Sequence, residues 1–126
     1  MAYDLNALTP SAPTSLAWGV AWTRFMLHDR VSPFVFADAE LVGVLSAHAF
    51  TSETVVYYRP HIAAAVLIET DPDRALNQSL LGAHITHQNP SDIAASIRRH
   101  GRWVDDAIED AAGERPASHR TLTAVF

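Results

Sequence analysis

The stretch Pro60-His-Ile-Ala-Ala-Ala-Val-Leu-Ile-Glu69 is almost entirely apolar and lies near the middle of the chain. A proline fits the first turn of a helix, because its missing N–H is not needed there. Asp71-Pro72 ends the segment, since the residue before a proline avoids the helical region. The run is too short to cross a bilayer, which takes about 20 apolar residues. We therefore predict a buried central helix, whose three consecutive alanines let other helices pack closely.

Two further helices are predicted before this segment. In residues 15–28, Trp18 and Trp22 share one face, and a second face is also nearly apolar. Such a helix must be buried on more than one side, so we expect one of these tryptophans to contact another subunit or a chain arm. The alternative is an ordinary core helix. Asp38 is expected to begin the next helix, which runs to about Phe50.

A third flanking helix is predicted after the central one. Asn89-Pro90-Ser91-Asp92 combines a capping residue, a first-turn proline and a capping-box acid. An apolar face follows to about Ala112, with Gly101 as a possible kink and Gly113 as a stop. Residues 83–88 alternate like a short strand or ribbon, and residues 55–58 are either extended or the lead-in to the central helix.

Length and composition describe a single globular domain. The chain has 126 residues, of which 48% are hydrophobic and 18% charged. We predict a mainly α fold, a small bundle of about four helices with a short β-ribbon or loop. The expected organisation is an N-terminal arm (1–14), a helical domain (15–113) and a C-terminal arm (114–126). The expected core comprises Leu41, Leu45, Ile62, Val66, Ile93, Ile97 and Val104.

Charge and residue content disfavour several classes of function. The net charge of −5 argues against duplex nucleic acid as the main partner, because phosphate binding favours a basic surface. The chain has no cysteine, which excludes disulfides, thiolate metal sites and cysteine nucleophiles. The first residues lack a signal-peptide pattern, so a cytosolic origin is expected.

We find no signature of catalysis or metal binding in the sequence. His84 and His87 are spaced as metal ligands only if they lie on a helix, and the glycine and proline around them disfavour one. Asp105, Asp106 and the acids after them are expected on a solvated face, with docking to a basic partner as the alternative. We predict no enzyme activity, no metal and no cofactor.

The last predicted helix changes from basic to acidic along its length. Arg98, Arg99 and Arg102 precede Asp105 and Asp106. This order suits contacts between copies in a ring. The alternative is pairing within the helix, such as Arg102 with Asp106 at i, i+4.

Two stretches are similar to small head–tail connector proteins of tailed bacteriophages. Trp22-Thr-Arg24-Phe-Met-Leu-His-Asp29 and Pro33-Phe-Val-Phe36-Ala-Asp38-Ala-Glu40-Leu41 resemble their opening: an arginine, an aspartate, a turn, an aromatic residue and an acidic helix start. Tyr57-Tyr58-Arg59-Pro60 with the alanines after it resembles their core helix, and the Asn89-Pro90 helix ending Gly101-Arg-Trp-Val-Asp105 also fits. Ala37 stands where these proteins commonly have a capping Ser or Thr.

The resemblance implies a structural virion protein of the phage neck. It implies a homo-oligomeric ring, typically a dodecamer, bound to the portal on one side and to a stopper or tail terminator protein on the other. DNA would pass through the lumen without specific binding, and no membrane is involved. The expected subunit interface comprises Trp18, Trp22, Arg98, Arg99, Arg102, Asp105 and Asp106.

The C-terminal arm is expected to bind a neighbour. Its apolar residues alternate with polar ones, which suits addition to the sheet edge of another chain. The alternative is a tail folded back on its own helices. The residues expected to contact the portal or a neighbouring subunit are Arg115, Arg120, Leu122, Ala124 and Phe126. The alternative to the whole assignment is a small cytosolic helical binding or regulatory module that acts as a dimer, and an enzyme using His84 or His87 has the least support.

Overall fold

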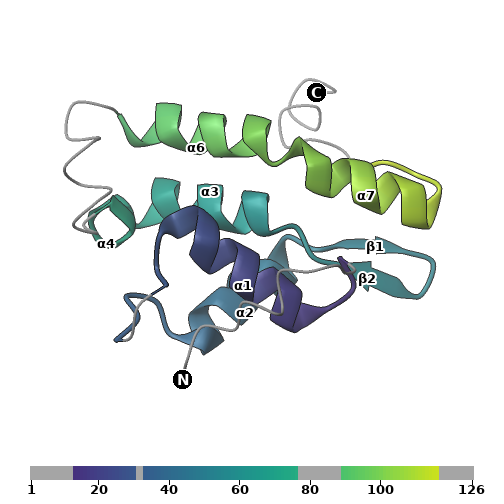
Figure 1. Cartoon of the computed structure of the whole chain (residues 1–126), viewed down its shortest axis with the longest axis horizontal. Helices are drawn as coiled ribbons and strands as arrows, with labels where there is room; N and C mark the ends of the chain where they lie inside the picture. Colours follow the sequence, from purple (N-terminus) through teal and green to yellow (C-terminus); the bar gives the residue numbers. More distant parts are fainter. Residues whose placement is uncertain (1–12, 31–32, 77–88, 117–126) are drawn as a thin grey trace.

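The fold is mainly helical, as the sequence predicts. The computed structural model describes residues 13–30, 33–76 and 89–116, and its elements appear in Figure 1. In chain order these are α1 (Leu16–Leu27), α2 (Asp38–Ala47), β1 (Phe50–Ser52), β2 (Val55–Tyr57), α3 (Pro60–Thr70), α4 (Pro72–Leu76), α6 (Pro90–His100) and α7 (Arg102–Ala112). No helix within these ranges is both long and apolar enough to span a membrane.

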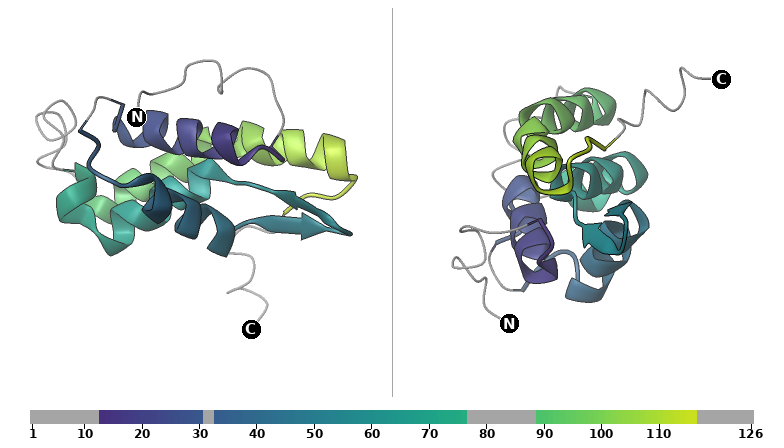
Figure 2. Two further views of the ribbon diagram at one scale, coloured as in Figure 1. Left: turned by 90° about the horizontal axis from the view of Figure 1, so that it is seen from below. Right: turned by 90° about the vertical axis from the view of Figure 1, so that its right-hand side faces the viewer.

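Helix α3 is the centre of the bundle, which confirms the first prediction. It packs against α1, α2, α4, α6 and α7, and the views in Figures 1 and 2 place α6–α7 on one side of it and α1 on another. Ala63, Ala64 and Ala65 are fully buried. Short side chains therefore sit where several helices approach one another.

Most of the expected core is buried, but two residues lie at its margin. Leu41, Leu45, Ile62, Ile93 and Val104 are buried. Ile97 is half-buried and packs against the core from outside. Val66 is also half-buried, because α3 leaves one side without a covering helix, where Glu69 and Thr70 are exposed. Val66 and Ile97 are therefore mostly covered, as predicted, but neither lies in the fully buried centre of the core.

The sequence predicts only the second strand of the β-hairpin between α2 and α3. Strands β1 and β2 are antiparallel, and Phe50 lies opposite Tyr57 and Ser52 opposite Val55. The extended segment at Val55 is confirmed, but α2 ends at Ala47, so the helix predicted to continue to Phe50 is shorter. Glu53 occupies the turn with a φ of 57°.

The helix ends follow the predicted signals. The Ser15 hydroxyl accepts a hydrogen bond from the N–H of Trp18 at 3.2 Å, and the Asn89 side chain accepts one from Ser91 at 2.8 Å. Gly113 ends α7 with a φ of 79°. Gly101 divides the predicted long helix into α6 and α7.

The first residues of the expected C-terminal arm fold back onto the bundle. The Ser52 hydroxyl donates to a carboxylate oxygen of Glu114 at 3.1 Å, and Pro116 is buried. The predicted boundary at 114 is therefore too early. The ribbon predicted at 83–88 and the rest of the arm from 117 lie outside the described residues.

Candidate functional site

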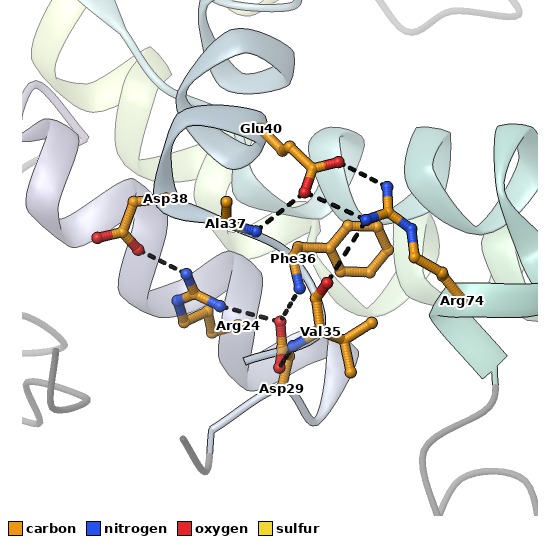
Figure 3. A network of polar contacts seen from close by, with 8 residues as sticks. All are labelled: Arg24, Asp29, Val35, Phe36, Ala37, Asp38, Glu40 and Arg74. Atoms are coloured by element: carbon orange, nitrogen blue, oxygen red, sulfur yellow. Dashed lines mark hydrogen bonds and ion pairs between the residues drawn. The ribbon is translucent and has the colours of Figure 1, made fainter. Parts of the chain in front are cut away.

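The motif behind the family resemblance forms one buried ionic network (Figure 3). Arg24 on α1 and Asp29 just after it are both 2% exposed, and their side chains meet at 2.9 Å. The Asp29 carboxylate also accepts hydrogen bonds from the N–H groups of Val35 at 2.8 Å and Phe36 at 3.0 Å. Asp29 thus fixes the chain between α1 and α2, and Phe36 enters the core.

The same network holds the start of α2. Arg24 reaches Asp38 in the first turn at 2.5 Å, and its guanidinium lies 3.8 Å from the centre of the Phe34 ring. Ala37 has no side-chain acceptor for a cap. Instead, its N–H donates to the Glu40 carboxylate at 3.0 Å. Acidic residues in a first turn also interact favourably with the helix dipole, so α2 starts without the missing Ser or Thr.

Arg74 ties α4 to this region from the surface. Its guanidinium pairs with Glu40 at 2.6 Å and with Asp71 at 2.8 Å, and it lies 4.5 Å from the Phe36 ring centre. The hydrogen bond from Arg74, followed by that from the Ala37 N–H, lowers the pKa of Glu40. Arg24 links α1 to Asp38 of α2, and Arg74 links α4 to Glu40 of α2. The network therefore holds these helices together.

A second buried cluster joins α3 to α7. Arg59, directly before α3, forms two hydrogen bonds to the Asp105 carboxylate at 2.9 and 3.1 Å. Nε2 of His61 lies 3.2 Å from the same carboxylate. Burial would raise the pKa of Asp105, but the hydrogen bonds from His61 and Arg59 together lower it. Burial is the main reason why the pKa of His61 is lowered.

This cluster corrects the prediction for Asp105. The carboxylate was expected on a solvated face and at a subunit interface, yet Asp105 is 8% exposed and paired within its own chain. His61 is 1% exposed, so the Asp105–His61 pair is closed to substrate. The arrangement joins the start of α3 to α7.

The other charged residues of the expected interface are partly engaged within the chain. Arg98 pairs with Glu69 at 2.7 Å, and Asp106 pairs with Arg115 at 2.6 Å. Arg115 also reaches Glu109 at 3.1 Å, so it lies against its own helix α7. The Arg102–Asp106 pair considered above does not form. Arg99 and Arg102 are exposed, and the described residues offer them no ion pair.

The tryptophans form a chain of ring contacts between α1 and α7. Trp18 meets Trp103 at a centroid distance of 6.1 Å, and Trp103 meets Trp22 at 4.9 Å. Phe25 continues the chain at 5.2 Å from Trp22. Trp18 is 4% exposed, so its own chain covers it and no second subunit is needed. Trp22 is half-buried, and its predicted subunit contact stays a prediction.

An aromatic strip therefore reaches the surface beside an open hollow. We define the strip as Trp22, Phe25 and Trp103; Phe25 and Trp103 are 40% and 41% exposed. Met26 lies one helical turn after Trp22 and lines the hollow, which has a volume of about 420 Å³. The remaining lining residues come from the end of α1 and from α6: His28, Asp92, Ile93, Ser96, Ile97 and Arg99.

Neither metal-binding groups in the described ranges nor known relatives define a site. The described ranges contain no group of His, Asp and Glu side chains that could hold a metal ion. The arm residues Arg120, Leu122, Ala124 and Phe126 lie outside those ranges, as do His84 and His87. No family model, curated protein or solved structure matches the chain. The strip and the hollow are thus the surface features from which a function is best argued.

Proposed function

We propose that this protein is a structural ring adaptor of a phage neck, placed between the portal and the tail-side stopper or tail terminator protein. In this role the chain forms a homo-oligomeric ring in the virion, and DNA passes through its lumen. It catalyses no reaction and holds no cofactor.

The observation that carries the proposal is the Arg24–Asp29 network. Arg24, Asp29 and Asp38 come from the two stretches that resemble the connector family, and they meet in three dimensions. Catalytic residues face a cleft that substrate can enter, whereas Arg24 and Asp29 are buried and orient α1 against α2. The motif therefore has a fold-defining role, as a structural protein requires.

The surface adds a second line of support. A monomeric protein rarely leaves large aromatic side chains exposed next to one another, and such patches usually mark interaction sites. The strip is contiguous, because Trp22 touches both Phe25 and Trp103. The net charge of −5 fits a lumen along which DNA slides without sticking.

The decisive experiment is co-expression with the portal protein encoded in the same genome. We expect a portal–adaptor complex in which electron microscopy shows an added ring at the tail side of the portal. Asp29→Ala breaks the network, and it should reduce ring formation in proportion to its loss of folding stability. A folded wild-type protein that stays a dimer and never joins the portal would favour the regulatory-module alternative.

A further inference from the structure

Four large apolar side chains are exposed in the described part of the chain, and they form two groups. Phe25 and Trp103 belong to the aromatic strip, at 40% and 41% exposure. Val55 and Val56 lie on the hairpin, at 40% and 39% exposure. The two groups differ in shape and in the charges around them.

The hairpin valines lie on a projecting element. The β1–β2 turn lies at one end of the molecule, beside the end of α7 (Figures 1 and 2). Neighbouring residues of a strand point to opposite faces, so Val55 and Val56 present apolar surface on both sides of the hairpin. A two-stranded hairpin is marginally stable by itself. A surface that covered these valines would stabilise it.

The hairpin is also acidic. Glu53 in the turn is exposed and adopts a φ of 57°. The hairpin from Phe50 to Tyr57 carries no arginine, lysine or histidine. We call residues 53–56 the hairpin tip: an apolar pair next to one carboxylate.

The aromatic strip lies on a surface where arginines outnumber acidic side chains. Met26, Ile93 and Ile97 give apolar lining to the hollow beside the strip, and Arg99 and Asp92 give it one charge of each sign. Arg102 precedes Trp103 on α7. The guanidinium of Arg30 lies 5.1 Å from the Phe25 ring centre.

These three arginines differ from the others in their ion pairing within the described ranges. No ion pair among the described residues includes Arg30, Arg99 or Arg102. The other arginines of those ranges all form one, namely Arg24, Arg59, Arg74, Arg98 and Arg115. In a protein of net charge −5, a basic aromatic surface is a specific feature that fits an acidic, apolar partner.

We propose that the hairpin tip of one copy docks on the aromatic strip and hollow of the next copy. The tip enters edge-on, so that Val55 and Val56 on its two faces meet the aromatic strip and the hollow respectively, and Glu53 pairs with Arg99 or Arg102. The inference rests on the ring assembly proposed above and names its subunit contact. It concerns a second copy because both complementary surfaces occur on the same chain.

The placement of the two surfaces suits a head-to-tail assembly. Helix α1 begins near the hairpin and runs away from it, so Phe25 in its last turns lies toward the other end of the molecule (Figure 1). Contacts between two different surfaces repeat from copy to copy, and they close into a ring when the rotation allows it. A symmetric dimer would instead bring identical surfaces together.

Cysteine cross-linking tests the contact directly, because the chain has no native cysteine. Thr54→Cys places a thiol on the tip, and Ser96→Cys places one in the hollow. A mixture of these two full-length variants should form a disulfide-linked heterodimer under mild oxidation. The matched control replaces Ser96→Cys by Thr70→Cys, an exposed position on α3, and should give little product. Equal yields from both mixtures, or no product in either, overturn the proposal.

Charge exchange provides a second test by light scattering. Glu53→Arg, or Arg99→Glu with Arg102→Glu, should raise the concentration for half-assembly by about tenfold or more, because like charges then face each other. Mixing the two variants should restore mixed assembly. Asp73→Arg makes the same change of charge on exposed α4 and should have no effect. Unchanged assembly of Glu53→Arg would overturn the contact.

The two proposals fail in different ways. Cross-linking uses the protein alone, whereas binding to the portal is measured separately. Tip-to-hollow links without portal binding would support the proposed subunit contact and contradict the proposed neck function. Portal binding without such links would support the neck function and contradict the subunit contact. Binding of single-stranded DNA that competes with the link would assign the strip to nucleic acid instead.

Discussion

Gly101 lies directly against His61: a Cβ atom on residue 101 would come within 2.2 Å of the Cβ of His61. The backbone of Gly101, at a φ of −91° and a ψ of 8°, is accessible to any residue. The position therefore requires glycine for space and not for conformation. This close approach brings the junction of α6 and α7 over the start of α3, where Asp105 meets Arg59.

Gly101→Ala should destabilise the protein. The added methyl group must displace the base of a side chain that is 1% exposed, and overpacking of this kind costs about 1–3 kcal/mol. Gly43→Ala is the matched control, because a Cβ there meets nothing within 4 Å and alanine favours a helix by up to about 1 kcal/mol. Urea unfolding should show opposite signs, and equal effects would contradict the contact.

Asp105→Ala should be among the most damaging single changes on α7. It leaves the Arg59 guanidinium, whose side chain is 10% exposed, without its carboxylate partner. Removing one partner of a buried pair costs about 3–5 kcal/mol. Asp110→Ala on the same helix removes an exposed carboxylate and should change the free energy of unfolding by less than about 0.5 kcal/mol. The comparison needs only thermal or urea melts.

Acidification should weaken the fold through His61. Burial holds the pKa of this imidazole below its ordinary value of 6.5, so the unfolded chain binds the proton more tightly. The stabilisation that comes from keeping His61 neutral is complete above about pH 6.5 and is lost as the pH falls below that value. The free energy of unfolding should therefore decrease from about pH 7.5 to about pH 5, before the carboxylates titrate.

The control for this effect is a pair of histidine variants. His61→Gln keeps a side-chain donor near Asp105 but does not titrate, so its stability should depend less on pH. Burial and Arg30 also lower the pKa of His28, and His28→Gln should remove a smaller share because that residue is exposed. Stability that stays constant or increases on acidification would contradict the assignment.

Asp29→Asn should lower the free energy of unfolding more than Asp38→Asn, although Arg24 binds both aspartates. The amide cannot accept from Arg24, Val35 and Phe36 as the carboxylate does, and buried groups left unsatisfied cost about 1–3 kcal/mol. Asp38→Asn acts on a side chain that is 41% exposed and should cost less than about 1 kcal/mol. Chemical unfolding of both variants measures the difference, and a larger loss for Asp38→Asn would contradict the network.

The helices were predictable because their signals are local. Pro60, Asn89 and Gly113 act within one turn of themselves, and each lies at the predicted helix end. The central position of α3 also follows from sequence, because a run of apolar residues with three alanines has no side suited to water. The partial exposure of Val66 was not predictable, because the sequence does not show which side of α3 lacks a neighbouring helix.

The charged residues were harder to place because their partners are distant in sequence. Asp105 stands among other acids on α7, and only the fold brings Arg59 and His61 to it across 46 and 44 residues. A strand of three residues, such as β1, is too short to show a period. The aromatic strip likewise depends on the packing of α1 against the first turn of α7, which no local pattern specifies.

The ring contacts among Trp18, Trp22 and Trp103 make the intrinsic fluorescence of this protein a local probe. The chain has three tryptophans in all, and each lies at the junction of α1 and α7. Emission therefore reports whether these two helices are together, whereas far-ultraviolet circular dichroism averages over every helix. If α7 separated before the bundle melted, the two signals would change at different denaturant concentrations, and their coincidence would show a single cooperative unit.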